Sequence, residues 1–413
     1  MTSESKQYRS MSWRSPALVI VAGCCIAAIG FGVRSTFGLY LDPMTSARGW
    51  SRETFSLALA IQNLMWGVGL PIAGAIADRF GASKVIVFGA LLYALGIYGM
   101  AQAETSGALY IAAGVLTGTG VAFTAFSLAM AAMVKVVNPE KRSFVLGLGT
   151  AAGSFGQVLF SPISQGFITS FGWQDALMLQ AAIIVVLIPL AFVLPGTRET
   201  AGSDGENQSL RSALSEAMGH NGFILLTLGF FVCGFHVAFI TVHFPSYIKD
   251  IGLAAQVGAW SLAIIGLFNI AGSFLSGVVG QKYSKKSSLS AIYLARAVVI
   301  TAMLLLPKTE VVIYMFSALM GLLWLSTVPL TTGIVAQVFG VRYLATLFGV
   351  VFLSHQIGSF TGVWLGGRLY DAYGSYNGMW WAGVFFGVVA AILHWPINEK
   401  PLPRLNTESA PAV

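Results

Sequence analysis

The sequence predicts an all-α membrane protein in which twelve transmembrane helices form two six-helix repeats. Three observations support this prediction. The chain is strongly apolar, it contains twelve separate apolar runs long enough to cross a bilayer, and its second half repeats residues and intervals of its first half. Together they indicate a chain that is folded inside a lipid bilayer rather than attached to its surface.

The composition excludes several classes of protein. Hydrophobic residues make up 56% of the 413 residues and charged residues only 9%, and the mean hydropathy is +0.77. Soluble globular domains have about 25% charged residues. Cys24, Cys25 and Cys233 lie in apolar runs without the spacing of metal ligands. The sequence also has no GxxxxGKS or GxxxxGKT loop and no catalytic constellation. We therefore expect neither an enzyme nor a bound cofactor or metal.

Twelve apolar runs approach or exceed the roughly 20 residues that a transmembrane helix requires. The first is too long for a signal-peptide core and lacks a small-residue cleavage site, so we expect it to remain as a span. The longest polar interval between spans, 196–220, is rich in Gly, Ser and charged residues, which is typical of a linker. It divides the chain into a first bundle (1–195) and a second bundle (221–413). The predicted spans are 16–42, 53–77, 84–103, 107–134, 143–169, 173–195, 221–248, 257–280, 287–307, 311–338, 343–370 and 376–397.

The basic residues predict the orientation. Most of the 23 Lys and Arg fall on one side of the membrane, together with both termini and the linker, and Lys/Arg-rich loops are cytoplasmic. The net charge of +7 is thus explained by topology, without a nucleic-acid partner. We expect a multi-pass protein with cytoplasmic termini in a bacterial inner membrane. The predicted outer side carries Arg48, Arg52, Lys249, Lys308 and Arg368, and two arginines, Arg34 and Arg296, lie inside spans.

The two halves repeat each other. Gly74 and Gly277 are separated by the same interval as Gly69 and Gly272, and the basic turns at 78–84 and 281–287 coincide at that interval. Near the same offset, "GFGV" at 30–33 matches "GFHV" at 234–237. Two bundles related by a parallel repeat are typical of one large group of transporters.

The segment "GAIADRFGASK" (74–84) resembles the loop between helices 2 and 3 of the major facilitator superfamily. The resemblance extends over nearly the whole chain, through the twelve spans, the central linker and the Gly-rich segment "GVLTGTG" at 114–120. It implies alternating access around a site near the membrane midplane. A solvated turn is the alternative interpretation of the charges in this motif, but the family makes Asp78 and Arg79 a charge pair that latches a gate. The motif residues are Gly74, Asp78, Arg79, Gly81 and Lys84.

Within the superfamily the chain resembles bacterial relatives of the monocarboxylate and oxalate/formate carriers. The matching segments are "FGLYLDPM" and "GWSR" within 37–52, "GLFNIAGSFLSG" at 266–277 and "SHQIGSFTGVWLGGRLYD" at 354–371. One departure matters, because those carriers have Asn-x-x-Gly-Arg in helix 8, where the arginine binds the substrate carboxylate. In this chain Asn269 and Gly272 are followed by Ser273, so the usual anion anchor is missing.

Arg34 is the leading candidate for an alternative anchor. A charge at mid-membrane costs about 2.5 to 3.5 kcal/mol even on translocon scales. Every acidic residue falls in a loop or near a helix end, so Arg34 has no obvious carboxylate partner within the spans. Guanidinium binds a carboxylate bidentately, so the substrate could be the counterion. A structural role, with Arg34 bonded to helix carbonyls or to the amides of Gln62 and Asn63, is the alternative. Arg296 belongs to a helix that is peripheral in the family, which favours a packing role.

Three of the histidines inside spans, His236, His243 and His355, could carry a coupled proton, since histidine titrates near neutral pH. His236 and His243 are seven residues apart, on one helical face, and His355 lies beside Gln356. Each could equally be a hydrogen-bonded packing residue. Further neutral contacts to substrate are expected from spans that line a central cavity, and aromatic residues there would suit a planar solute. The predicted substrate contacts are Arg34, Gln62, Asn63, Gln157, His236, Asn269, Ser273, Trp324, His355 and Gln356.

These features predict a secondary transporter that imports a small organic carboxylate, with proton symport as the expected coupling and the monomer as the working unit. A neutral aromatic or heteroaromatic solute, such as a riboflavin-like vitamin, is the alternative substrate, because the helix 8 arginine is replaced by Ser273. A membrane sensor that does not transport is a third possibility. Such a sensor would carry an added soluble domain or a long tail, and we expect neither.

Overall fold

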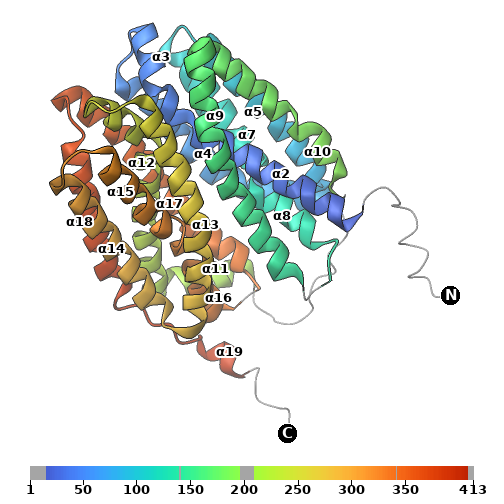
Figure 1. The fold of residues 1–413 in the computed structure, drawn as a ribbon. Coiled ribbons are helices and arrows are strands. Elements are labelled where there is room, and N and C mark those ends of the chain that lie inside the picture. The colour runs from blue at the N-terminus through green and yellow to red at the C-terminus, as the bar shows by residue number, and fades with distance from the viewer. Residues whose placement is uncertain (1–14, 139–140, 196–208, 341, 408–413) are drawn as a thin grey trace.

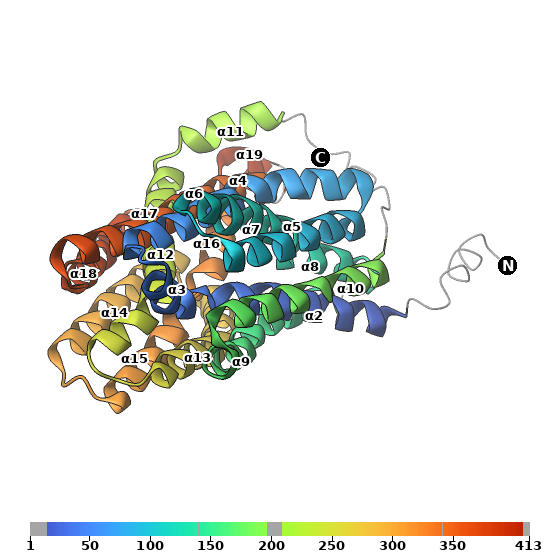
Figure 2. The same cartoon turned by 90° about the horizontal axis from the view of Figure 1, so that it is seen from above.

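A computed structural model describes residues 15–138, 141–195, 209–340 and 342–407. The regular secondary structure of these residues is helical, with short turns between the helices, and none of them belongs to a strand. Helices α2 to α10 form a first bundle, and helices α12 to α18 form a second bundle beside it (Figures 1 and 2).

The first bundle has six membrane-crossing legs. Gly172 divides the fifth leg from the sixth, because its positive φ of 83° interrupts the long helix α9. The fourth leg is irregular and contains a π-helical segment, η3. The elements are α2 (Pro16–Ser35), η2 (Phe37–Tyr40), α3 (Leu41–Arg48), α4 (Arg52–Phe80), α5 (Ala82–Gln102), α6 (Ser106–Leu109), η3 (Tyr110–Leu116), α7 (Thr117–Phe123), α8 (Phe126–Val134), α9 (Arg142–Val185) and α10 (Leu187–Val193).

The second bundle repeats this arrangement. Its fourth leg is also broken, between α15 and α16. A short helix, α11, lies within the predicted linker, whose residues 196–208 are outside the described residues. The elements are α11 (Leu210–Met218), α12 (Asn221–Asp250), α13 (Ala255–Lys282), α14 (Lys285–Leu305), α15 (Glu310–Leu323), α16 (Thr327–Phe339), α17 (Leu344–Tyr373), α18 (Asn377–His394) and α19 (Pro403–Thr407).

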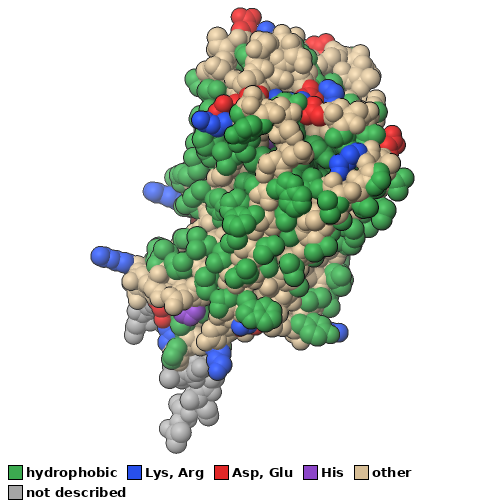
Figure 3. Space-filling view, turned by 90° about the vertical axis from the view of Figure 1, so that its left-hand side faces the viewer, with side chains coloured by type: hydrophobic (Ala, Val, Ile, Leu, Met, Phe, Trp, Pro, Cys, Tyr) green, Lys and Arg blue, Asp and Glu red, His purple; other side chains and the backbone are tan. Residues whose placement is uncertain are grey.

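The predicted twelve-helix fold is confirmed. Eleven helical segments among the described residues are long and apolar enough to cross a membrane, and one of them, Phe144–Val193, contains the two legs separated at Gly172. Figure 3 shows hydrophobic side chains over the middle of one face, with charged side chains toward the two ends. This distribution is the one expected for contact with lipid tails.

Local signals in the sequence position the helix ends. The hydroxyls of Ser15, Ser51, Ser284 and Thr309 accept hydrogen bonds from the first turns of α2, α4, α14 and α15. Such N-caps satisfy amide groups that have no partner within the helix. The first crossing extends beyond the predicted span 16–42, because η2 and α3 continue it to Arg48.

The bundles meet along two helix pairs, α4 with α17 and α9 with α13, and η2 also packs on α12. Glycine allows the closest approach. A Cβ atom on Gly38 in η2 would lie 2.3 Å from the Thr241 carbonyl oxygen in α12, so only glycine fits there. We call the end at which α3 lies, uppermost in Figure 1, the latch end. The opposite end, where α10 stops and α11 begins, is the linker end.

Candidate functional site: the interface between the two bundles

Arg34 lies in the last turn of α2 and faces α4. Its Nη2 donates a hydrogen bond to Asn63 Oδ1, and its guanidinium carbon lies 4.4 Å from the centre of the Trp66 ring. Asn63 is held in place because its Nδ2 donates to the Leu59 carbonyl at 2.8 Å. Among the described residues Arg34 has no carboxylate partner, and its buried Nε has no hydrogen bond. Asn63 therefore orients the cation without neutralising it.

A small pocket lies against Arg34 on the latch side. Residues of both bundles line it, and the enclosed space is about 10 Å³. A cavity of this size holds one water molecule at most. This pocket is therefore too small for an organic solute. The lining residues are Arg34, Phe37, Gly38, Leu59, Gln62, Asn63, Ala238, Thr241 and Val242.

Trp66 connects Arg34 to the second bundle. Its ring meets Phe352 of α17 edge to face, with centroids 5.5 Å apart, and Phe352 stacks on His355 at 5.6 Å. Gln356 lies one turn beyond Phe352 and packs against Gly67, which is the neighbour of Trp66. The buried amide of Gln356 and the indole Nε1 of Trp66 have no hydrogen-bond partner. Buried polar atoms usually have partners, so these groups are available to a ligand.

Four other predicted contacts already hold the fold together. Gln157 Nε2 donates to the Leu262 carbonyl at 2.9 Å, and Asn269 Nδ2 donates to Ser154 Oγ at 3.0 Å, so both join the two bundles. The Ser273 hydroxyl donates to Asn269 Oδ1 at 3.1 Å. Gln62 Nε2 donates to the Ala113 carbonyl in the π-helical segment at 3.0 Å, whereas the hydrogen bond of Arg34 goes to Asn63.

The histidines occupy separate environments. His236 Nε2 lies 2.8 Å from the Gly383 carbonyl, inside the second bundle. His243 is fully buried near the latch end, and His355 is stacked against Phe352. The structure thus does not gather the three histidines into one relay.

Arg296 and Trp324 form part of the second bundle rather than of the interface. The Arg296 guanidinium donates to the carbonyls of Leu323 and Trp324, where the fourth leg breaks. The Trp324 side chain is fully buried. These contacts agree with the packing role that the sequence favours for Arg296.

The turn motif lies at the linker end. Gly81 has a φ of 94°, a conformation that glycine adopts easily. Gly74 is half-buried on α4, and Lys84 is exposed in the first turn of α5. Asp78 and Arg79 are exposed, and the described residues provide no ion pair between them and the second bundle. The predicted charge latch at this end is therefore not engaged in this conformation.

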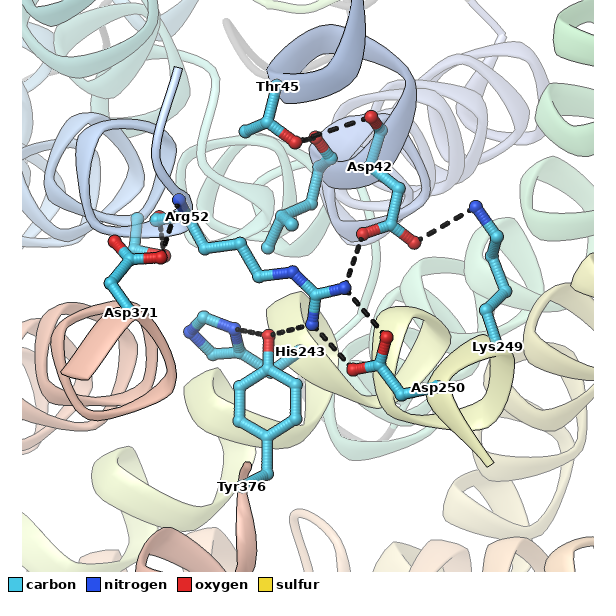
Figure 4. Close-up of polar contacts among 10 residues, drawn as sticks. Asp42, Thr45, Arg52, His243, Lys249, Asp250, Asp371 and Tyr376 are labelled. Carbon is cyan, nitrogen blue, oxygen red and sulfur yellow. Dashed lines mark hydrogen bonds and ion pairs between the residues drawn. The ribbon is translucent and has the colours of Figure 1, made fainter. Parts of the chain in front are cut away.

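At the other end a charge cluster joins the two bundles, and the sequence alone predicts no role for it. Arg52 of the first bundle binds Asp250 of the second through two hydrogen bonds, Nη1 to Oδ2 at 2.6 Å and Nη2 to Oδ1 at 2.8 Å (Figure 4). Asp42 pairs with Arg52 at 3.0 Å and with Lys249 at 3.1 Å. Asp371 accepts the backbone amides of Arg52 and Glu53 at 3.1 and 2.7 Å.

We call Asp42, Arg52, Lys249, Asp250, Asp371 and Tyr376 the latch. Bidentate arginine pairs are among the stronger ion pairs, whereas single exposed pairs contribute only about 0.2–1 kcal/mol. The cluster can thus close one end and still open reversibly. The sequence did contain a signal, because it placed Arg52 and Lys249 on the poorly basic side and the aspartates at helix ends.

Comparison with known proteins places this geometry in a family. The model of the Major Facilitator Superfamily matches residues 23–362. Monocarboxylate transporter 13 of Rattus norvegicus is 22% identical over 386 residues, which cover 92% of this chain and 89% of that protein. The oxalate:formate antiporter of Oxalobacter formigenes is 23% identical over 413 residues, covering 98% and 95%.

Solved structures show the same fold. The nucleoside transporter NupG superposes with a TM-score of 0.75 at 13% identity and covers 92% of this chain and 99% of that chain. The inward open xylose transporter XylE from E. coli gives 0.70 at 14% identity, covering 92% and 95%. The family match extends over most of the chain and the bundles have the expected form. The chain therefore belongs to the Major Facilitator Superfamily and is a secondary transporter, not an enzyme.

Proposed function

We propose that this transporter imports a small organic carboxylate and that Arg34 is the anion anchor. The observation that carries the proposal is a half-buried arginine at the bundle interface that has an amide partner but no carboxylate among the described residues. A lone charge in the membrane is expensive, and a bound carboxylate would neutralise it. The names of the monocarboxylate and oxalate:formate relatives support this substrate class.

We propose import, with the latch on the outer side in the predicted orientation. With both termini cytoplasmic in a bacterial inner membrane, the latch faces outward. Opening the latch would admit the solute to Arg34, and closing it would leave the exit on the cytoplasmic side. A proton would enter with the solute, carried by a histidine or by the carboxylate itself. We expect a single chain to complete this cycle, because the interface lies between its own two bundles.

A neutral aromatic or heteroaromatic solute is the second candidate. One support is that Ser273 replaces the family's arginine and donates its hydroxyl to Asn269. The other is aromatic: the Trp66 ring lies against Arg34 and meets Phe352, which is one turn before the unpartnered amide of Gln356. Stacking and neutral hydrogen bonds would then replace anion binding.

Uptake by proteoliposomes distinguishes these candidates. Labelled lactate, oxalate and riboflavin are compared in the parent, in Arg34→Gln and in Arg34→Lys. Hydrogen bonds to charged groups contribute about 1.5–3 kcal/mol, so Arg34→Gln should reduce carboxylate uptake about tenfold to a hundredfold. Arg34→Lys keeps the positive charge but loses the bidentate geometry of the guanidinium, so its carboxylate uptake should lie between those of the parent and Arg34→Gln.

Arg211→Gln, on the exposed face of α11, serves as the matched control for loss of an arginine. Normal carboxylate uptake by Arg34→Gln would overturn the anchor. Uptake of riboflavin alone, unaffected by Arg34→Gln, would establish the second candidate.

A further inference from the structure

A chain of hydrogen bonds runs from the latch into the second bundle. Arg52 Nη1 donates to the Tyr376 hydroxyl at 3.1 Å, and that hydroxyl lies 3.0 Å from His243 Nδ1. His243 Nε2 lies 2.8 Å from the Val363 carbonyl oxygen. Figure 4 shows His243, Tyr376 and the Arg52 guanidinium in sequence. The chain joins a fully buried imidazole to the ion pair that closes the latch.

The acceptors fix the direction of every bond in this chain. A carbonyl oxygen can only accept, so Nε2 of His243 carries the ring proton. Nδ1 is then an acceptor, and the Tyr376 hydroxyl must donate to it. Burial raises the pKa of Tyr376, so the phenol keeps the proton that it donates. The Tyr376 oxygen is left to accept from Arg52. The closed latch thus uses a neutral His243 with both ring nitrogens engaged.

A second ring proton disfavours this arrangement. If Nδ1 were protonated, it could only donate, so the Tyr376 hydroxyl would have to turn away and the phenol hydrogen would lose its acceptor. Only the Tyr376 hydroxyl would separate the imidazolium from the Arg52 guanidinium, and like charges repel. The charged groups that act on His243 are Arg52 of α4 and Asp42 of α3, and its ring bonds Tyr376, which precedes α18. The other titratable groups of the surrounding elements contact Arg52, Asp42 or Glu53 and not the imidazole. They are Asp371, Tyr370 and Arg368 of α17, Lys249 and Asp250 of its own helix, and Glu53 of α4.

We propose that His243 is the proton-binding residue of the latch, and that protonation of His243 and closure of the latch exclude each other. The proton binds from the solvent on the latch side while the latch is open, and it leaves Nδ1 before Tyr376 can return. His243 therefore senses the pH on the latch side and is not the group that carries the symported proton. Acid on that side therefore holds the latch open. The proposal rests on the transport cycle but not on the carboxylate substrate. That the latch side is the outer side of the membrane rests on the proposed orientation.

Ser246 provides a reporter of latch opening. It lies on α12, one turn beyond His243. The residue is 1% exposed, and its hydroxyl has no hydrogen-bond partner. It lines a second small pocket, in which Gly38, Asp42 and Gln165 of the first bundle cover it. A cysteine at this position is nearly isosteric and should react with a membrane-impermeant maleimide only when the latch opens. The parent chain controls for Cys24, Cys25 and Cys233.

Labelling of Ser246→Cys is measured in sealed right-side-out vesicles between pH 5.5 and 8. Because thiol reactivity itself changes with pH, each rate is divided by the rate of Ser246→Cys combined with His243→Gln. Glutamine can accept from Tyr376 and donate to Val363, but it does not titrate. We expect the ratio to rise severalfold at the acidic end. A ratio that stays constant with pH would overturn the proposal.

Two further variants keep the test decisive. Tyr376→Phe removes the link, so the acid response should disappear even though His243 is present. His394→Gln removes a buried histidine of α18 that is bonded to the Ala390 carbonyl, and the response should remain. Loss of the response in His394→Gln, or its survival in Tyr376→Phe, would contradict the assignment. A His243-dependent response that occurs only in inverted vesicles would support it and overturn the proposed orientation.

Discussion

Two arginines lie inside apolar helices, and their surroundings differ. Arg296 is 0% exposed and makes three hydrogen bonds to the carbonyls of Leu323 and Trp324, which the break between α15 and α16 leaves without helical partners. Arg34 makes one hydrogen bond, to Asn63, and borders a pocket between the bundles. The first cation completes a helix break, whereas the second is available to a ligand.

Arg296→Gln should therefore lower stability rather than substrate affinity. Each buried carbonyl left without a donor costs about 1–3 kcal/mol, so the apparent unfolding temperature in detergent should fall by several degrees. The KM for uptake, measured on the folded fraction, should change little. Arg34→Gln should instead raise the KM for uptake and leave the apparent unfolding temperature nearly unchanged. Unchanged unfolding together with abolished transport in Arg296→Gln would assign Arg296 a direct role.

At the scale of elements, η2 determines how closely the bundles approach at the latch end. Gly38 has no side chain, and a Cβ there would lie 2.3 Å from the Thr241 carbonyl and 2.7 Å from the Val242 carbonyl. Both contacts are with backbone, which cannot rotate away as a flexible side chain can. Closure of the latch therefore depends on glycine in η2.

Gly38→Ala should hold the latch open. The added methyl group separates η2 from α12, so labelling of Ser246→Cys should increase and the rate of uptake should fall. Gly147→Ala is the matched control, because a Cβ at Gly147 in α9 meets no atom within 4 Å. Equal labelling in Gly38→Ala and the parent would show that η2 does not limit closure.

At the scale of the whole molecule, the two ends of the interface differ in their charge pairs. The latch end is closed by ion pairs between the bundles, and Asp78 and Arg79 at the linker end are exposed without such pairs. Alternating access requires the other arrangement as well, so the free energies of the two closed ends must be nearly balanced. A substitution at one end should shift the population toward closure of the other.

Asp250→Asn should increase labelling of Ser246→Cys, because it weakens the bidentate pair with Arg52. Asp78→Asn should decrease labelling, because it removes the charge expected to close the linker end. The double variant should return labelling toward the parent value, since opposing shifts in one equilibrium cancel. An additive rise in the double variant would show that the two ends are not coupled.

The sequence predicted much of this fold because the membrane imposes simple requirements. Run length and composition were sufficient for the twelve crossings, and Gly172 separates two of them close to the predicted boundary. Arg34 could be identified as a candidate because a charge inside an apolar run is rare enough to be noticed. The division of roles among the candidate contacts could not be predicted. Gln157 and Asn269 are used to join the bundles, and Gln356 is left unpartnered.

The sequence by itself determined the class of protein, the number of crossings and the residues that must be explained, because these follow from the cost of polar groups in lipid. Only the tertiary structure decided which end is closed and by which residues. Arg52 meets Asp250 and Tyr376 across intervals of 198 and 324 residues. Such pairs depend on how two bundles pack against each other, and no local pattern in the sequence records that geometry.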